Sequence, residues 1–357
     1  MHMSDALVSP VVGGALWLTM AVLVRHAARA NEHQPDSRRV PLMGVLGAFV
    51  FAAQMINFSI PGTGSSGHLA GALMLSVLLG PHAAFLVMAS VVTVQALFFA
   101  DGGLFALGAN IINLGFFTCY VAYPWLYRPL VGPNPSARRL LWSSVLTSVV
   151  GLELGALAVV VETLLSGLSA LPFGTFTLFM LPVHAAIGVV EGLVTAAVLL
   201  LIRRARPELL TTAAAPFSRP ARSVGPVLVA LAVSALLIGG GLSWFASARP
   251  DGLEWSLERS SPAQLEPQPR TDALHLLLAR VQHATSWLPD YSLKRTEPDA
   301  TMQVNRAQPG WPAVDAGTSL SGIVGAVMTL LMALGLGLAL KAWRARSAVD
   351  KPEAGTS

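Results

Sequence analysis

The sequence predicts an all-α protein, a polytopic bundle of membrane-spanning helices. Hydrophobic residues make up 54% of the 357 residues and charged residues only 12%, with a mean hydropathy of +0.61. Soluble proteins carry roughly 25% charged residues, so this chain is too apolar to cover a surface that faces water. The apolar residues also gather in long runs separated by short polar segments, which is typical of membrane helices.

The apolar runs give about nine candidate spans, because a helix needs about 20 apolar residues to cross the hydrocarbon core of a bilayer. The third run is short enough to be a partial or tilted span. In chain order, the runs cover residues 10–26, 40–57, 69–80, 83–100, 104–123, 140–168, 176–202, 224–245 and 319–340.

The basic residues set the predicted orientation. Sixteen of the 23 lysines and arginines follow odd-numbered spans, in the segments 25–39, 128–139, 203–222 and 341–351. Short loops rich in Lys and Arg stay in the cytoplasm. We therefore expect the N-terminus outside, the C-terminus in the cytoplasm, and the loop 58–68 outside.

Polar segments divide the chain into two modules. Residues 1–205 form a seven-span module, and residues 206–223 form a cytoplasmic linker with three prolines. Residues 224–345 form a two-span module whose spans are separated by the polar external loop 246–318. Residues 346–357 remain as a cytoplasmic tail.

The stretch GTGSSGHL (62–69) has the GxxxxG spacing of a phosphate-binding loop. Such a loop requires Lys and then Ser or Thr at the next two positions, between a soluble strand and a soluble helix. Here those positions are His68 and Leu69, and both flanking runs are apolar. We therefore expect no nucleotide at this loop. Since the chain carries no Walker motif elsewhere, we do not expect it to be an enzyme that hydrolyses ATP.

The first two residues offer a different chemistry. An α-amino group followed by His2 can chelate one cation through the Met1 amine, the His2 amide nitrogen and the imidazole Nδ1. His68, on the same side of the membrane, could fill a fourth position in that plane. Four coplanar nitrogens favour Ni²⁺ or Cu²⁺, whereas Zn²⁺ prefers a tetrahedron. The alternative is that both histidines are ordinary hydrogen-bonded polar residues.

Other polar residues fall within or beside the predicted spans, where ionisable groups are costly and face the protein interior. His184 and Glu191 are seven residues apart and share a helix face, either as a structural pair or as the proton relay of a metal transporter that needs no ATPase. Asp101 could attract cations or cap the helix that follows it, and we favour the cap. Asn110 and Asn113 could bond to neighbouring helices, or could orient the ring of His2 or His68. For the function of the whole chain, a membrane scaffold without transport activity is a third possibility, beside a metal transporter that works with ATPases and one that works without them.

Five blocks of the sequence carry a family resemblance. They are MHMSDALVSP (1–10), PGTGSSGHLAGALMLSVLLGP (61–81), QALFFADGGLFALGANIINLG (95–115), HAAIGVVEGLVTAAVLLLIRRARPELL (184–210) and FASARPDGLEWSLE (245–258). The first four resemble the substrate-binding components of cobalt and nickel energy-coupling-factor transporters, the CbiM/NikM family. The fifth resembles the PDGLE motif of the two-span companion subunit of these transporters, so the chain looks like a fusion of the two subunits.

The resemblance implies a metal site made by Met1, His2 and His68, with Ni²⁺, or alternatively Co²⁺, as the transported ion. It also implies a bacterial inner-membrane location, with a transmembrane coupling protein and cytoplasmic ATPases as partners. The glycines around position 64 are then expected to let the loop fold over the amino terminus and present His68. The family's Pro-Asp-Gly near the start is replaced here by Ser4-Asp5-Ala6.

Overall fold

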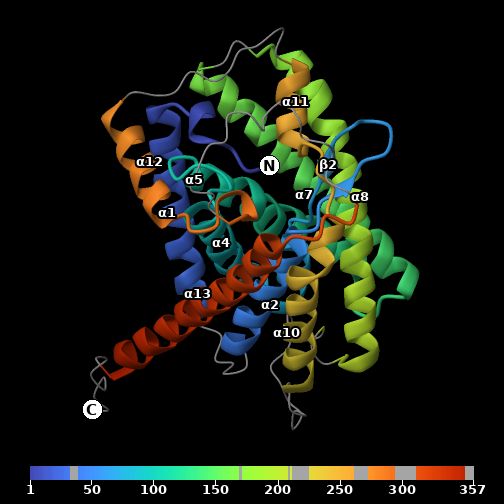
Figure 1. The fold of residues 1–357 in the computed structure, drawn as a ribbon. Coiled ribbons are helices and arrows are strands. Elements are labelled where there is room, and N and C mark those ends of the chain that lie inside the picture. Colours follow the sequence, from blue (N-terminus) through green and yellow to red (C-terminus); the bar gives the residue numbers. More distant parts are fainter. Residues whose placement is uncertain are drawn as a thin grey trace.

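The computed structural model is a bundle of helices, which agrees with the predicted all-α class (Figure 1). It describes residues 1–32, 39–168, 171–207, 210, 225–260, 272–293 and 311–349. The only strands in this described part are β1 (Phe58–Ser59) and β2 (Ser66–Gly67), which pair antiparallel. Most of the predicted linker 206–223 and tail 346–357 lies outside the described residues.

Every predicted span of the first module coincides with a helix. The fifth span is a short α-helix that continues as a π-helix, and the third span is a helix of only 8 residues. The helical elements of this module are η1 (Asp5–Leu7), α1 (Pro10–Glu32), α2 (Arg39–Gln54), α3 (Ala72–Leu79), α4 (Pro81–Phe98), α5 (Leu107–Ile111), η2 (Ile112–Tyr127), α6 (Arg128–Val131), α7 (Ala137–Ser166) and α8 (Phe173–Ala205).

The second module contains two apolar helices, of 16 and 34 residues, with shorter helices between them. The sequence predicts only a polar loop over 246–318, but the described part of that loop contains α11 and α12. The side chain of Asp272 caps the first turn of α12 by accepting from the His275 amide at 3.2 Å. The elements are α10 (Gly225–Gly240), η3 (Leu242–Phe245), α11 (Gly252–Ser260), α12 (Ala273–Thr285), η4 (Pro289–Tyr291) and α13 (Ala316–Val349).

Several helices are long and apolar enough to cross a membrane. In the described part of the chain these are α1, α4, α7, α8 and α13, while α2 and α10 are apolar but shorter. The chain is therefore a multi-pass membrane protein. The number of spans and the orientation of the two termini stay predictions.

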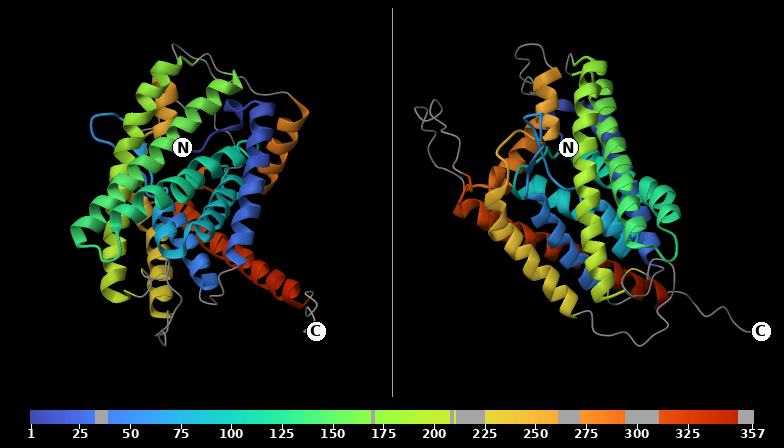
Figure 2. Two further views of the ribbon diagram at one scale, coloured as in Figure 1. Left: turned by 180° about the vertical axis from the view of Figure 1, so that it is seen from behind. Right: turned by 90° about the vertical axis from the view of Figure 1, so that its right-hand side faces the viewer.

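The two modules pack against each other along α2, which lies beside α10 and α13 (Figure 2). Glycines permit this close approach, as small residues commonly do between membrane helices. A Cβ atom at Gly44 would lie 3.1 Å from the Leu330 carbonyl oxygen, and one at Gly47 would lie 3.2 Å from the Thr329 side chain. The helices of the second module are thus an integral part of the helix bundle.

The amino terminus lies inside one end of the bundle, close to α11 and β2, whereas the far end of α13 points away from it (Figure 1). Segments far apart in the sequence meet around Met1. They are the hairpin of β1 and β2, the loop after α4, and the segment that leads into α11.

Candidate metal centre

The first residues of the chain are held inside the bundle by hydrogen bonds to Met3, which is fully buried. Its amide donates to Asn110 Oδ1 at 2.7 Å, while Asn110 Nδ2 donates to its carbonyl at 3.1 Å. The Gly103 amide donates to the same carbonyl at 2.9 Å. Asp5 accepts from the Ala106 amide at 2.9 Å. These contacts place Met1 and His2 at a defined position, with side chains only 3% and 5% exposed.

A tight hairpin carries His68 to the same place. Phe58 pairs with Gly67 and Ser59 with Ser66. The turn between the strands includes Gly62 and Gly64, whose φ angles of +79° and +85° are unfavourable for residues with a Cβ atom. The glycines therefore shape this loop, as the sequence predicts.

Glu191, on α8, fixes the chain just beyond His68. Its two carboxylate oxygens accept from the backbone amides of Ala70 and Gly71 at 2.7 and 3.2 Å. The side chain is buried, so these bonds form away from water, where they are strong. Glu191 thus positions the hairpin end that bears His68.

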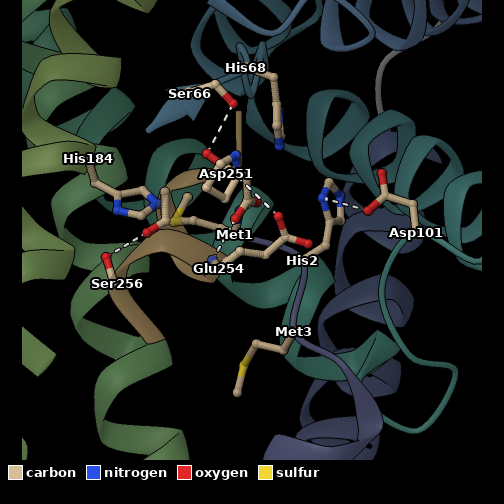
Figure 3. A network of polar contacts seen from close by, with 12 residues as sticks. Met1, His2, Met3, Ser66, His68, Asp101, His184, Asp251, Glu254 and Ser256 are labelled. Carbon is tan, nitrogen blue, oxygen red and sulfur yellow. Dashed lines mark hydrogen bonds and ion pairs between the residues drawn. The ribbon is translucent and has the colours of Figure 1, made fainter. Parts of the chain in front are cut away.

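The rings of His2 and His68 face each other across a narrow gap (Figure 3), with centroids 5.3 Å apart and planes inclined by 22°. His68 Nδ1 lies 3.1 Å from the Leu69 carbonyl oxygen, so it donates there and leaves a lone pair on Nε2. Burial, followed by the nearby Met1 ammonium and His2, lowers the pKa of His68 to about 4. His68 is therefore a neutral imidazole with a nitrogen available to a metal.

His2 has partners on both ring nitrogens. Nδ1 lies 3.3 Å from Asp101 Oδ1, and Nε2 lies 3.2 Å from Gln95 Oε1. Burial lowers the pKa of His2; Asp101 opposes this effect, and the Met1 ammonium adds to it. Chelation through Nδ1 requires the ring to turn away from Asp101.

The Met1 ammonium pairs with a carboxylate of the second module, Asp251, whose Oδ2 is 3.3 Å away. Asp251 Oδ1 accepts from the Glu254 amide at 2.8 Å, and Glu254 Oε2 accepts from the Asp251 amide at 3.2 Å. These reciprocal bonds form a capping box at the start of α11. Burial raises the pKa of Asp251, but the Met1 ammonium, the Glu254 amide, His68 and His184 together hold it well below its usual value.

Two cavities adjoin this cluster. A small one of about 10 Å³ is lined by Met1, His68, His184 and Asp251, among others. A larger one of about 830 Å³ reaches His2 and His68 from the exposed Glu254 and Asp290. Its lining includes five carboxylates and one arginine, namely Asp5, Asp101, Asp251, Glu254, Asp290 and Arg249, which favours the entry of a cation.

One predicted role is wrong. Asp101 does not cap the following helix; it faces His2 and accepts from the Tyr291 hydroxyl at 2.5 Å. Asn113 donates to Glu162 of the neighbouring helix α7 at 2.7 Å, which is one of the two roles predicted for it, and Asn110 holds the Met3 backbone. Among the described contacts neither asparagine bonds an imidazole, so the orienting role stays a prediction.

Gln95 was missed from the sequence, because it stands in a stretch that otherwise reads as an apolar span. The contact of Asp251 with Met1 was missed as well. The Asp-x-x-Glu spacing of 251–254 was a readable signal of a helix cap. No local pattern signalled that the carboxylate would reach Met1.

Side chains alone do not complete a metal site in this structure. Across the described residues, no three His, Cys, Asp or Glu side chains converge closely enough to hold a metal ion. A site at His2 and His68 therefore depends on backbone nitrogens as well, and the Met1 amine and His2 amide are the ones at hand.

Comparison with known proteins identifies the two modules. The family model CbiM, described as the cobalt uptake substrate-specific transmembrane region, matches residues 2–209. The chain belongs to the CbiM family. A second model, the PDGLE domain, matches residues 225–342, so this CbiM protein is fused to a PDGLE module.

Relatives share the fused arrangement. A protein of Archaeoglobus fulgidus, provisionally named a fused nickel transport protein NikMN, is 34% identical over 94% of this chain and 98% of its own length. The fused nickel transport protein NikMN of Rhodobacter capsulatus is 30% identical, over 68% of this chain and 74% of that protein. A crystal structure of a transition metal transporter is 28% identical, with a TM-score of 0.51, over 59% of this chain and 97% of that one. These similarities make the present chain a membrane protein of metal transport.

Proposed function

We propose that this CbiM protein captures Ni²⁺ from outside the cell in a planar site of four nitrogens. The ligands are the Met1 amine, the His2 amide nitrogen, the His2 imidazole and the His68 imidazole. The observation that carries the proposal is the convergence of two facing imidazoles beside a buried terminal amine.

The proposed steps of capture involve the residues around the ligands. A cation enters through the cavity of about 830 Å³, attracted by the carboxylates on its wall. The His2 ring turns from Asp101 toward the ion, while His68 already offers its Nε2. The ammonium loses one proton and the His2 amide another, and both leave through the cavity to water. The dication and the amidate together leave one unit of positive charge at the site, as the ammonium did before capture.

Nickel is preferred over cobalt because four coplanar nitrogens, including a deprotonated amide, suit low-spin Ni²⁺. The fused relatives named as nickel transport proteins support the same choice. Cobalt is the alternative cargo, supported by the description of the family model.

We further propose that the chain is the substrate-specific subunit of an ATP-driven importer in the bacterial inner membrane. Its partners are a transmembrane coupling protein and cytoplasmic ATPases, since the sequence holds no Walker motif of its own. Energy from ATP hydrolysis in the partners then reopens the site toward the cytoplasm.

The test is nickel binding to the purified chain, measured by calorimetry and by the absorption spectrum. Wild type should bind one Ni²⁺ and show the d–d band of a planar yellow complex. His68→Ala should lose tight binding, whereas the control His283→Ala, an exposed histidine on α12, should bind as wild type does. Unchanged nickel affinity in His68→Ala would falsify the site.

A further inference from the structure

We infer that Asp251, the aspartate of the PDGLE segment, is the counter-ion of the metal site, supplied to it by the second module. This inference rests on the proposed function. It gives the PDGLE module a defined chemical role at the site where the metal is held.

The position of Asp251 follows from the docking of its segment on the first module. The Ser66 amide and hydroxyl donate to the carbonyls of Pro250 and Arg249, each at 2.8 Å, so the segment runs alongside β2. Ser247 donates its amide to the Asn57 carbonyl at 2.7 Å. The segment is therefore fixed to the hairpin that bears His68 before it reaches Asp251.

Gly252 lets the carboxylate approach the amine. A Cβ atom at this position would lie 2.9 Å from Val183 and 3.0 Å from His184, so a side chain would push the segment off α8. Leu253 is only 2% exposed, and the Trp255 ring meets Phe179 edge to face at 5.5 Å. This packing presses Asp251 into the space beside Met1 (Figure 3).

The two oxygens of Asp251 have separate partners. Oδ1 caps α11 through the Glu254 amide, and Oδ2 pairs with the Met1 nitrogen at 3.3 Å. The cap is an ordinary structural role, but it does not require the second oxygen to face a buried amine. The contact of the second oxygen, Oδ2, with the Met1 nitrogen is the one that places a negative charge beside a proposed metal ligand.

The positive charge at the site requires a negatively charged partner. Because the Met1 side chain is only 3% exposed, a positive charge there has little access to water, and a buried charge is costly unless it is paired. The site carries one positive unit before capture and one after it. Asp101 faces the imidazole instead of the amine, so Asp251 is the carboxylate placed to balance the charge in both states.

The decisive variant is Asp251→Asn in the full chain. Asparagine caps helices as well as aspartate does, so α11 should form, while the charge beside the amine is lost. Nickel affinity should fall by about tenfold, because the free site can lose its unpaired charge by releasing the amine proton, whereas the nickel complex keeps a positive charge without a partner. Asp251→Glu should restore most of the affinity. Glu258→Gln, which removes an exposed charge from the same helix, should bind as wild type does.

Two further readouts separate a counter-ion from a ligand and from a merely structural residue. At saturating nickel, Asp251→Asn should keep the wild-type d–d band, because the four nitrogen ligands are unchanged. Without metal, an acylating reagent should modify the Met1 amine faster in Asp251→Asn than in Glu258→Gln, as read by mass spectrometry of the N-terminal peptide. Should Asp251→Asn fail to fold, Asp251→Ser keeps a capping oxygen and replaces it in each measurement.

Wild-type affinity in Asp251→Asn would overturn the inference, and so would a shifted d–d band, which would make the carboxylate a ligand. Absence of nickel binding in wild type would instead overturn the proposed function. In that case, equal acylation rates in the two variants would still refute the contact between Asp251 and the amine.

Discussion

Glu191→Ala should weaken nickel binding although Glu191 touches no proposed ligand. The carboxylate accepts from the Ala70 and Gly71 amides at 2.7 and 3.2 Å. Removing it leaves two buried backbone donors without their partner, in a protein interior that gives them little water. The hairpin can relieve this by moving away from α8, and His68 then moves with it.

The expected loss of nickel affinity follows from the two hydrogen bonds of Glu191. A hydrogen bond to a charged group contributes about 1.5–3 kcal/mol, so losing both costs about 3–6 kcal/mol in holding the hairpin. Metal binding must supply this free energy to bring His68 back. Since 1.4 kcal/mol is a factor of ten, nickel affinity should fall by roughly a hundredfold or more. Glu191→Gln keeps one acceptor oxygen, so its loss should be smaller, about tenfold to a hundredfold.

The assay is calorimetry on the purified chain, together with nickel uptake into vesicles that contain the ATPase partners. The matched control is Thr195→Ala, which removes a buried polar side chain one turn further along the same helix. Its nickel affinity should equal that of wild type. Nickel affinity in Glu191→Ala equal to that of wild type would refute this role for the carboxylate.

The same variants address the alternative of a proton relay through His184 and Glu191. A relay predicts that Glu191→Gln binds nickel normally but no longer transports it, and that a protonophore stops uptake in wild type. The positioning role predicts weakened binding in both variants and uptake that depends on the ATPases. In the structure, His184 Nδ1 is bonded to the Met180 carbonyl at 2.7 Å and both Glu191 oxygens are bonded to amides, which favours the positioning role.

Three other perturbations test the site. A few residues added before Met1 should abolish tight nickel binding as fully as His2→Ala does, since the amine becomes an amide; normal calorimetric titration of the extended chain would contradict this. Asn110→Ala removes two bonds to the Met3 backbone and should weaken binding by about 1–3 kcal/mol, with an unchanged dissociation constant as the opposing result. Gly67→Ala would place a Cβ atom 2.4 Å from Ile187, so the melting temperature should fall by an amount equivalent to about 1–3 kcal/mol. Adding Ile187→Ala should recover part of that loss, and no recovery would count against the clash.

The helical framework could be predicted from the sequence because hydropathy alone marks a membrane helix. The run 176–202 became α8 (Phe173–Ala205), and the run 319–340 became part of α13 (Ala316–Val349). The helices within the polar segment 246–318 were missed for the same reason. α11 has only 9 residues and α12 has 13, so their signal is a short amphipathic period inside a polar, proline-containing segment.

The site could be predicted in part. His2 and His68 were identified by the chemistry of an N-terminal chelate and by family resemblance, and the structure brings their rings together. The roles of Asp101 and Glu191 were not predictable, because each depends on a partner more than 90 residues away along the chain. A single sequence shows that a carboxylate is buried, but not which amide or ring it meets.

The junction of the two modules in one polypeptide has a kinetic and regulatory consequence. Because Asp251 and Met1 belong to the same molecule, their encounter is intramolecular and does not depend on the protein concentration. A docking surface between the modules that is too weak to hold two separate proteins together would then be enough to keep Asp251 beside Met1. The stoichiometry of the two modules is also fixed at synthesis, so the cell cannot tune uptake by withholding the companion alone.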